Sequence, residues 1–554
     1  MKLVECVPNF SEGRDKAILD AIAQQIKAVK NVTLLDVDPG VDTNRTVFTM
    51  VGEPQAVVEA AFQAIKKAAE LIDMSKHKGA HARMGATDVC PFIPVSEISM
   101  EECIELSKQL GQRVGDELGI PVYLYEYSAT KPERTNLAVV REGEYEALPE
   151  KMTKEEWKPD FGPQKFNAKS GATVIGAREF LIAYNINLNT RDKKKATEIA
   201  NIIREKGTLK RDDKGKIVKD EHGNKVYEAG LFYHCKAVGW YIDEYNRAQI
   251  SMNLTNYNIT PPHLVLEKVR ELAVERGVVI TGSELVGLIP KEAIIAAGKY
   301  YLHRLDESAG LPDKRIIETA IQSMGLAELS EFDIDKKVIE FAIKAENRLA
   351  DMTLEGFCDE LSTDSPAPGG GSVAALCASM SASLSAMVSN LTINKKGYEK
   401  VWKEAKEIAE AAQKVKNNAI HAIDEDTQAF YDMMDAMRLP KKTEEEIAFR
   451  NQQIESATKN AILVPYKSIE LAKECVVLAE KISKIGNTNA LSDAGVGALT
   501  AQTAAAAAYL NVKINLAGLT DENFKKEILE KALNLKKEID AIAKSVFDFV
   551  DNSI

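Results

Sequence analysis

The sequence predicts a multidomain protein whose N-terminal half is mixed α/β, with two similar α/β subdomains, and whose C-terminal half is an all-α helical bundle. Three observations support this. The chain has 554 residues, which is more than one hydrophobic core usually organises. As far as about Gly325, short β-rich runs alternate with amphipathic helical runs. Beyond residue 335, strand signals disappear and long Ala-, Lys- and Glu-rich segments continue to the C-terminus.

The first subdomain is predicted over residues 1–175. Its predicted strands are LVECVPNF, VTLLDVDPG, TVFTMVG and, later, IPVYLYEYSA. One helix begins near Pro54, where proline suits the first turn, and a second helix is MEECIELSKQLGQRVGDEL. These elements alternate as an α/β layer structure requires.

The pattern restarts in the second subdomain, predicted over residues 176–326. Here TVIGAREFLIAYNINLN, HCKAVGWYI and AQISMNLTNY are predicted strands, and KKATEIANIIRE and HLVLEKVRELAVERG are predicted helices. The stretch 206–225 is polar, contains glycine and mixes both charges, which predicts an exposed hairpin or loop without a chemical role.

A linker is predicted over residues 327–335 and a helical domain over residues 336–554. The loop STDSPAPGGGS separates an opening helix, ending at Leu361, from a helix rich in small residues. Further helices are predicted in TNALSDAGVGALTAQTAAAAAYLNV and over residues 398–437, 443–482 and 521–550. Because so much alanine gives a thin core, we expect this domain to be buried against a second subunit, in a dimer at least.

Composition narrows the classes of function. A net charge of −12 disfavours a general nucleic-acid binder. The longest apolar stretches are interrupted by polar residues, so no membrane span is expected. The N-terminus lacks the features of a signal peptide, and the seven cysteines are scattered without CxxC pairs. We therefore expect a cytoplasmic protein with reduced thiols.

The densest polar cluster of the first half is HKGAHARMGATDVCPFIPV, residues 77–95. His77 and His81 stand four apart, as zinc ligands do on a helix, but Gly79 disfavours a helix and no third ligand is evident. We expect no metal. One histidine can instead act as a general acid and base, because imidazole titrates near neutral pH. The alternative is a histidine that only makes structural hydrogen bonds in a loop.

This cluster, together with CVPNFSEGRD and DVDPGVDTNRTVFTMVG, resembles the formiminotransferase domain of the formimidoyltransferase-cyclodeaminase family. The resemblance continues through PDFGP, GATVIGAREFLIAYNINL and GLIP. It implies that His81 is catalytic. The family reaction moves a formimino group from N-formimino-L-glutamate to N5 of tetrahydrofolate. A histidine that removes the N5 proton and protonates the departing glutamate nitrogen supplies both proton transfers.

The resemblance also implies a folate-binding segment between the subdomains, in GPQKFNAKSG. Its glycines permit close approach, its amides can pair with a pterin and its lysines can meet carboxylates. The residues expected to bind folate are Gly162, Pro163, Gln164, Lys165, Phe166, Asn167, Ala168, Lys169, Ser170 and Gly171. Asp38 and Arg83 are further candidates, the first to steady the amidinium or the histidine and the second to hold a carboxylate. The alternative is that Asp38 is only a turn residue and Arg83 only a surface cation.

The helical half carries DSPAPGGGSVAALCASMSASLSAMVSNLT, IDEDTQAFYDMMDAMRLPK and NTNALSDAGVGALTAQTA, which look like the cyclodeaminase/cyclohydrolase family. That family's reaction would close N10 of 5-formimino-tetrahydrofolate onto the amidine carbon and release ammonia. In IDEDTQAF, Asp424 and Asp426 cannot share one helix face. We select Asp426 as the acid and base, with Asp424 as the fallback. Asn489, Ser492 and Asp493 are possible pocket residues.

Both resemblances lie in the order of a bifunctional enzyme of histidine degradation and one-carbon metabolism. They imply tetrahydrofolate as co-substrate, with its polyglutamate tail, and a homo-oligomer built from dimers. Two alternatives stay open: a transferase whose helical half serves only oligomerisation, and a non-catalytic folate-binding scaffold.

Overall fold

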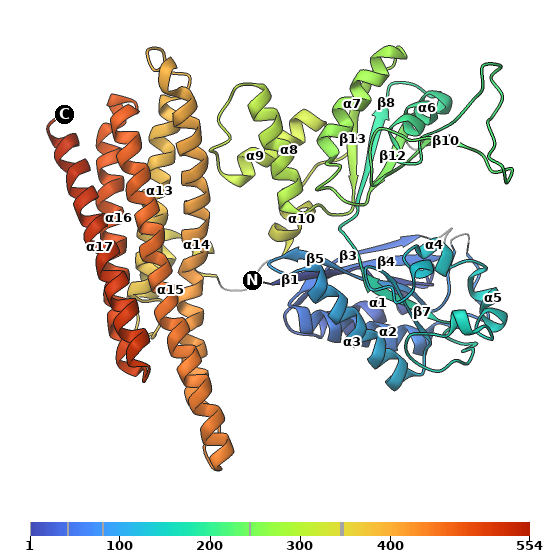
Figure 1. Ribbon diagram of the computed structural model, residues 1–554, viewed down its shortest axis with the longest axis horizontal. Coiled ribbons are helices and arrows are strands. Elements are labelled where there is room, and N and C mark those ends of the chain that lie inside the picture. Colours follow the sequence, from blue (N-terminus) through green and yellow to red (C-terminus); the bar gives the residue numbers. More distant parts are fainter. Residues whose placement is uncertain (1, 41–43, 80–81, 243–244, 344–347) are drawn as a thin grey trace. The chain divides into compact units, whose positions relative to one another are not determined.

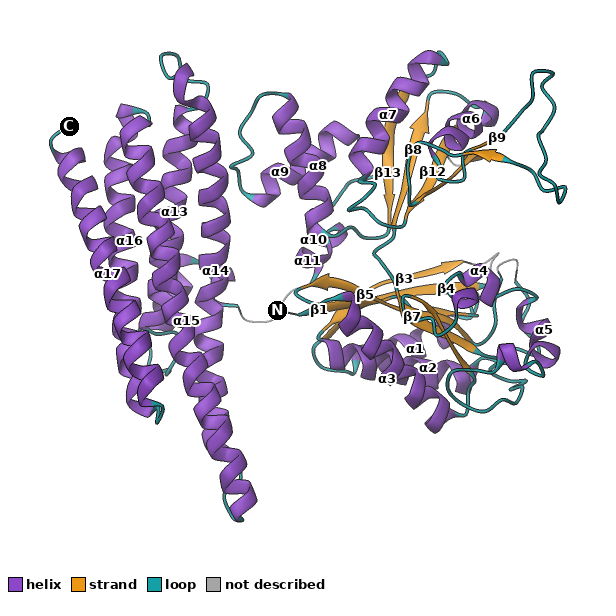
Figure 2. Cartoon of the chain, in the orientation of Figure 1, coloured by secondary structure: helices purple, strands orange, loops and turns teal. Residues whose placement is uncertain are grey.

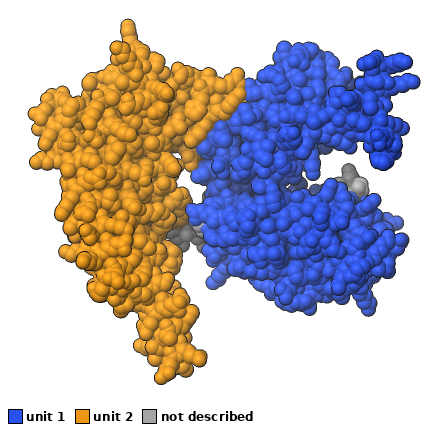
Figure 3. Space-filling view, viewed as in Figure 1, with its two compact units in different colours: residues 1–297, 321–344 blue, residues 298–320, 345–554 orange. Residues whose placement is uncertain are grey.

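The computed structural model describes residues 2–40, 44–79, 82–242, 245–343 and 348–554. It divides into two compact units, one of residues 1–297 with 321–344 and one of residues 298–320 with 345–554 (Figure 3). The first unit contains sheets covered by helices, and the second is helical (Figure 2). This confirms the predicted fold class: two α/β subdomains followed by a helical C-terminal half.

A mixed sheet forms the centre of the first subdomain (Figure 1). Its strands run in the order β1-β4-β2-β5-β7-β6, with β3 paired to β4. β5 and β6 lie parallel to β7, and the other pairs are antiparallel. The bounds are β1 Leu3–Cys6, β2 Asn9–Phe10, β3 Val32–Gly40, β4 Arg45–Gly52, β5 Thr87–Ser96, β6 Val122–Glu126 and β7 Thr173–Ala177.

Helices α1 (Lys16–Lys27), α2 (Pro54–Leu71) and α3 (Met100–Leu118) bury their apolar faces against this sheet in one core. The ends of α3 follow from local chemistry. Ser99 and Glu102 form a reciprocal capping box at its start, and Gly119, at φ +62°, ends it in the left-handed conformation. Short helices α4 (Leu137–Val140) and α5 (Glu144–Lys151) follow β6.

The prediction of one strand in TVIGAREFLIAYNINLN is wrong. β7 lies between β5 and β6 in the first sheet, whereas β8 (Ile182–Leu188) pairs with β12 and β13 in a second sheet. Between them the chain leaves the strand conformation, and the Arg178 amide donates to the Phe92 carbonyl at 3.0 Å. Strand propensity indicates which residues suit an extended chain but not which strand they pair with. The sequence therefore does not predict that the chain changes sheets between β7 and β8.

The second subdomain has an antiparallel sheet in the order β11-β12-β8-β13. Its other strands are β11 Cys235–Ile242, β12 Arg247–Leu254 and β13 Ile280–Val286, and its helices include α6 Lys193–Ile203 and α7 Pro262–Glu275. The polar stretch 206–225 forms an exposed hairpin between β9 (Thr208–Leu209) and β10 (Tyr227–Glu228). Asp212 and Asp220 stabilise its turns because their carboxylates accept hydrogen bonds from backbone amides.

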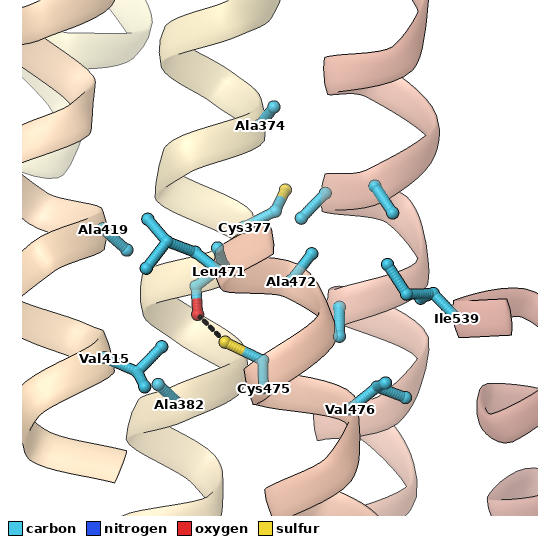
Figure 4. Close-up of a cluster of buried hydrophobic side chains, with 14 of the residues drawn as sticks. Ala374, Cys377, Ala382, Val415, Ala419, Leu471, Ala472, Cys475, Val476 and Ile539 are labelled. Carbon is cyan, nitrogen blue, oxygen red and sulfur yellow. Dashed lines mark hydrogen bonds between the residues drawn. The ribbon is translucent and has the colours of Figure 1, made fainter. Parts of the chain in front are cut away.

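The second unit is a bundle of long helices. Their bounds are α12 Leu354–Leu361, α13 Gly370–Thr392, α14 Trp402–Arg438, α15 Glu444–Ile485, α16 Leu491–Asn515 and α17 Glu522–Asp551. Alanine makes up much of the core, where side chains of α13, α14, α15, α16 and α17 meet (Figure 4). The Cys475 thiol donates to the Ala378 carbonyl at 3.3 Å. Small side chains let these helices approach closely.

Residues 298–320 group with the helical unit. They include the end of α8 (Lys291–Arg304) and the start of α9 (Asp313–Met324), and α10 (Ile334–Lys337) and α11 (Ile339–Ala342) follow in the first unit. Asn390 of α13 donates to the Gly310 carbonyl at 2.8 Å, and the Lys406 ammonium of α14 donates to Asp306 at 2.5 Å. The segment is therefore tied to two helices of the bundle.

By length and apolar composition alone, α13 could cross a membrane, with a mean hydropathy of 1.5 over its most apolar window. In the structure, 67% of that window is buried. This is the burial expected of a central helix in a bundle.

Candidate functional sites

The loop that carries the predicted histidines lies at the entrance to β5. Residues 80 and 81 are outside the described part of the chain, so the structure does not place His81. His77 is described: Arg83 Nε lies 3.3 Å from its Nδ1, and its Nε2 lies 2.9 Å from the Asn44 carbonyl oxygen. Because arginine only donates, Nδ1 accepts and Nε2 carries the proton. His77 thus ties the loop to Asn44.

Arg83 is nearly buried and already has carboxylate partners. Its guanidinium donates to Glu146 through two nitrogens, at 2.6 and 2.8 Å, and to Glu144 at 2.8 Å. The hydrogen bond to Glu146, above all, raises the pKa of Arg83 above its ordinary value. Arg83 therefore fixes α5 against the loop, and its role in holding a substrate carboxylate stays a prediction.

Asp38 lies on β3, opposite Val47 of β4, and its side chain is exposed. Its role beside the histidine or the amidinium also stays a prediction.

A buried aspartate organises the base of this loop. Asp88 is fully buried at the start of β5 and accepts from the Met84 amide at 3.0 Å. Arg45 donates to Asp88 at 2.5 Å, and Arg141 makes an ion pair with the same carboxylate. Arg45 also donates to the Asn9 side chain at 2.7 and 3.0 Å. Burial lowers the pKa of Arg45, whereas the charge of Asp88 opposes this change.

The predicted folate segment contacts this same loop. Gly85 and Gly171 form an isolated β-bridge, and the Ala86 amide donates to the Ser170 carbonyl at 2.9 Å. Gly171, at φ +66°, packs so closely that a Cβ would overlap the Met84 carbonyl oxygen. The structure thus brings together two motifs that stand some eighty residues apart in the sequence.

Within the segment, several predicted binding groups have protein partners. Gln164 Nε2 donates to the Met152 carbonyl at 3.0 Å, and Lys169 Nζ donates to the Glu70 carbonyl at 2.8 Å. The Asn167 side chain accepts from the Ser170 amide at 3.0 Å and so closes the turn. The Phe166 ring lies 5.5 Å from the Tyr145 ring, centre to centre. The exposed residues of the segment are Gly162, Pro163, Gln164, Lys165, Ala168 and Lys169.

In the helical unit, the structure brings the GGGS motif and the acidic turn of α14 together. Ser372, in the first turn of α13, donates through Oγ to Asp426 Oδ2 at 3.2 Å. Gly371 lies so close that a Cβ there would overlap the Asp426 carboxylate. Burial raises the pKa of Asp426 above its ordinary value, and the hydrogen bond from Ser372 opposes the rise. A carboxyl group at a helix N-terminus with a raised pKa is suited to proton transfer.

Asp424 has a different environment. Its carboxylate accepts from the Leu349 amide at 2.8 Å and from Arg348 Nε at 3.4 Å. It therefore anchors the segment before α12, which favours Asp426 over Asp424 as the acid and base. Asn489 lies in the 3-10 turn Thr488–Ala490, and Ser492 and Asp493 lie in the first turn of α16 that follows it. All three stay predictions as pocket residues.

Sequence reasoning missed the partners of these groups. Asp88 lies within the polar cluster of residues 77–95 but was given no role, and Arg45 and Arg141 carried no signal that they would converge on it. Ser372 was part of the GGGS motif but not of the predicted site. Within the described ranges, no group of three or more His, Cys, Asp and Glu side chains could hold a metal ion. The expectation of no metal stays a prediction, because His81 lies outside these ranges.

A cavity of about 540 Å³ lies elsewhere, between the residues after α6 and the strands β11 and β12. None of the residues predicted for either reaction lines it.

Three family models match the chain. They are the formiminotransferase domain, N-terminal subdomain, at residues 3–178, the formiminotransferase domain at residues 183–344, and formiminotransferase-cyclodeaminase at residues 353–534. A formimidoyltransferase-cyclodeaminase of Dictyostelium discoideum is 42% identical over 100% of this chain and 99% of its own length. A glutamate formimidoyltransferase of Streptococcus pyogenes serotype M1 is 44% identical over 54% of this chain and 93% of its own length.

The other half has relatives of its own. A methenyltetrahydrofolate cyclohydrolase of Methylorubrum extorquens is 38% identical over 36% of this chain and 97% of its own length. The two halves thus each match a protein that exists alone, and their combination matches a protein along its whole length.

Proposed function

The chain belongs to the formiminotransferase-cyclodeaminase family, and we propose that it carries two successive folate-dependent activities. The first is glutamate formimidoyltransferase, which moves the formimino group of N-formimino-L-glutamate to N5 of tetrahydrofolate. The second is formimidoyltetrahydrofolate cyclodeaminase, which closes the product to 5,10-methenyl-tetrahydrofolate and releases ammonia. The observation that carries this proposal is the match of both halves, in this order, to a bifunctional relative over its full length.

In the transferase reaction, N5 of tetrahydrofolate attacks the amidine carbon and gives a tetrahedral intermediate. His81 removes the N5 proton and delivers a proton to the glutamate nitrogen, which then leaves. This division of labour needs one group that both accepts and donates near neutral pH, as imidazole does. Support for His81 comes from its position in the family motif, directly before Ala82 at the entrance to β5.

The folate lies against residues 162–171 in this proposal. The contact of this segment with the loop 82–86 supports it, because a pterin bound to the segment would lie beside the loop that follows His81. The exposed Lys165 is available to a carboxylate of the folate's glutamyl tail.

In the cyclodeaminase reaction, N10 attacks the amidine carbon and the amidine nitrogen leaves as ammonia. Asp426 accepts the N10 proton and passes one to the departing nitrogen. Its raised pKa favours both steps, because the protonated form is accessible closer to neutral pH. Ser372 and the first turn of α13 hold the carboxylate in place.

The test is to mix the purified protein with tetrahydrofolate and N-formimino-L-glutamate and to follow methenyl-tetrahydrofolate absorbance and ammonia together. The proposal expects both products in equal amounts. Accumulation of 5-formimino-tetrahydrofolate without ammonia would leave only a transferase with a helical oligomerisation module. Binding of substrates without either product would indicate a non-catalytic folate scaffold.

We propose further that the protein is cytoplasmic, acts in histidine degradation and assembles as a homo-oligomer built from dimers. The thin alanine core supports assembly, and so do exposed apolar side chains on α13 and α16, including Met380, Leu391 and Val496. Sedimentation velocity on the purified chain tests this: a single monomeric species would contradict it.

A further inference from the structure

The cluster around Asp88 carries more positive charge than its structural role requires. Two guanidinium groups, Arg45 and Arg141, converge on one fully buried carboxylate. These three side chains carry two positive charges and one negative charge. An excess cation in a largely buried place is costly unless an anion compensates it. The cluster is therefore suited to receive an anionic group from outside the protein.

Arg141 has the donor that such a group would need. Its Nε donates to Asp88 Oδ1 at 3.3 Å and its Nη2 pairs with Asp88 Oδ2. Within the described part of the chain, no protein acceptor lies within hydrogen-bond distance of its Nη1. The side chain is 13% exposed, so it is not fully closed off from solvent. Asp88 fixes the orientation of the group and leaves one edge open.

The cluster contacts residues 82–84, which end the proposed catalytic loop. Arg45 Nη1 is 3.4 Å from the Ala82 carbonyl oxygen, and the Met84 amide donates to Asp88. Ala82 follows His81 in the sequence. An anion bound at Arg141 would therefore lie close to the residues that follow His81 in the sequence.

The substrate of the proposed transferase has an anion in the matching place. In N-formimino-L-glutamate, the α-carboxylate sits on the carbon that bears the nitrogen leaving in the reaction, whereas the side-chain carboxylate is farther away. We propose that Arg141, oriented by Asp88 and backed by Arg45, binds the α-carboxylate of N-formimino-L-glutamate. This inference rests on the proposed function and assigns a substrate-binding residue to its first activity.

The experiment compares three formimino donors in the full-length protein: N-formimino-L-glutamate, N-formimino-4-aminobutyrate, which lacks the α-carboxylate, and N-formimino-2-aminobutyrate, which lacks the side-chain carboxylate. The readout is kcat/KM, or the inhibition constant against N-formimino-L-glutamate where an analogue is not turned over. For both donors that carry the α-carboxylate, Arg141→Gln should lower kcat/KM, or weaken inhibition, by roughly a hundredfold, as removal of a desolvated charge partner does. It should not change kcat/KM or the inhibition constant for N-formimino-4-aminobutyrate, nor the KM for tetrahydrofolate.

Two further variants separate binding from structure. Arg141→Lys keeps the charge but loses the forked geometry, so its loss should be smaller than that of Arg141→Gln. Arg113→Gln is the matched control, because Arg113 also pairs with two carboxylates, Glu59 and Glu117, but on α2 and α3. With all three donors, it should give the same kcat/KM or inhibition constant as the wild-type protein.

Each other result overturns the inference. Equal loss with all three donors would make Arg141 a purely structural partner of Asp88. Loss confined to N-formimino-4-aminobutyrate and N-formimino-L-glutamate would assign Arg141 to the side-chain carboxylate. No loss with any donor would exclude Arg141 from binding. Failure of the proposed function looks different, because the unchanged protein would then transfer no formimino group from N-formimino-L-glutamate.

Discussion

At the scale of single residues, the two neighbouring aspartates of α14 should differ sharply in effect. Asp426→Asn removes the proton-transfer group proposed for ring closure and should lower the cyclodeaminase kcat by ~10²–10⁴-fold. It should leave transfer of the formimino group unaffected, because the transferase residues lie in the other unit. Ammonia release from supplied 5-formimino-tetrahydrofolate measures the first activity, and glutamate release measures the second.

Asp424→Asn is the matched control. It weakens the contacts to Leu349 and Arg348 and should cost about 1 kcal/mol of stability, with the cyclodeaminase kcat nearly unchanged. A larger kcat loss for Asp424→Asn than for Asp426→Asn would reverse the assignment.

Glu5 should make the stability of the first unit depend on pH. It is buried on β1, and burial raises its pKa from 4.5 to about 7, although the charge of Arg178 opposes the rise. The folded state therefore holds this proton more tightly than the unfolded state. The resulting contribution to stability is fully present below pH 4.5 and is lost as the pH rises through 7. At about 1.36 kcal/mol per pKa unit, the loss is on the order of 3 kcal/mol.

Glu5→Gln removes the titrating group. Urea unfolding of the first unit should show the variant gaining stability over the unchanged protein between pH 5 and pH 8, by about that amount. Glu133→Gln, at an exposed position, controls for loss of a carboxylate in general. A difference that is constant with pH would show that Glu5 is ionised at both pH values in the folded protein.

At the scale of elements, the start of α13 should control the cyclodeaminase site through backbone space. A Cβ at Gly371 would overlap the Asp426 carboxylate, so Gly371→Ala should turn that carboxylate away from Ser372. Because misplacing a reacting group by about 1 Å can cost ~10²-fold in rate, we expect a loss of that order in ammonia release.

Gly369→Ala is the control for this change. Nothing lies within 4 Å of a Cβ at Gly369, and its φ of −136° is open to any residue. Its kcat should stay close to that of the unchanged protein. Equal losses in the two variants would mean that flexibility of the glycine run, and not space for Asp426, governs the site.

Elements also differ in how far the sequence predicted them. The long helices were predicted closely because caps and periodicity are local: MEECIELSKQLGQRVGDEL forms α3 from Met100 to Leu118. The division of one apolar run into β7 and β8 was not predicted, because both strands have the same propensity and only distant partners tell them apart.

The sites show the same limit. The motifs around residues 77–86 and 162–171 were found as patterns, and so were GGGS and the acidic turn. Their pairing in space was not, because Gly85–Gly171 and Ser372–Asp426 are contacts between distant residues. The convergence of Arg45 and Arg141 on Asp88 depends on tertiary packing alone.

At the scale of the whole molecule, the main question is what the protein gains from having both units in one chain. Relatives of each half exist as separate proteins, one named glutamate formimidoyltransferase and the other methenyltetrahydrofolate cyclohydrolase. The product of the first reaction is nevertheless the substrate of the second. A polyglutamate tail that stays attached while the folate head group changes site would raise the effective concentration of the intermediate at the second site.

This predicts a kinetic difference between the intact protein and an equal mixture of two variants, His81→Ala and Asp426→Asn, each purified before mixing. With polyglutamyl tetrahydrofolate, the intact protein should form methenyl-tetrahydrofolate without a lag and release little free 5-formimino-tetrahydrofolate. The mixture should show a lag, because the intermediate must leave one protein and diffuse to another. With monoglutamyl tetrahydrofolate, the difference in lag between the two preparations should be smaller, because this folate lacks the polyglutamate tail that would keep it attached. Equal accumulation of free intermediate by both preparations would show that the tail does not retain it, whatever the activity of each site.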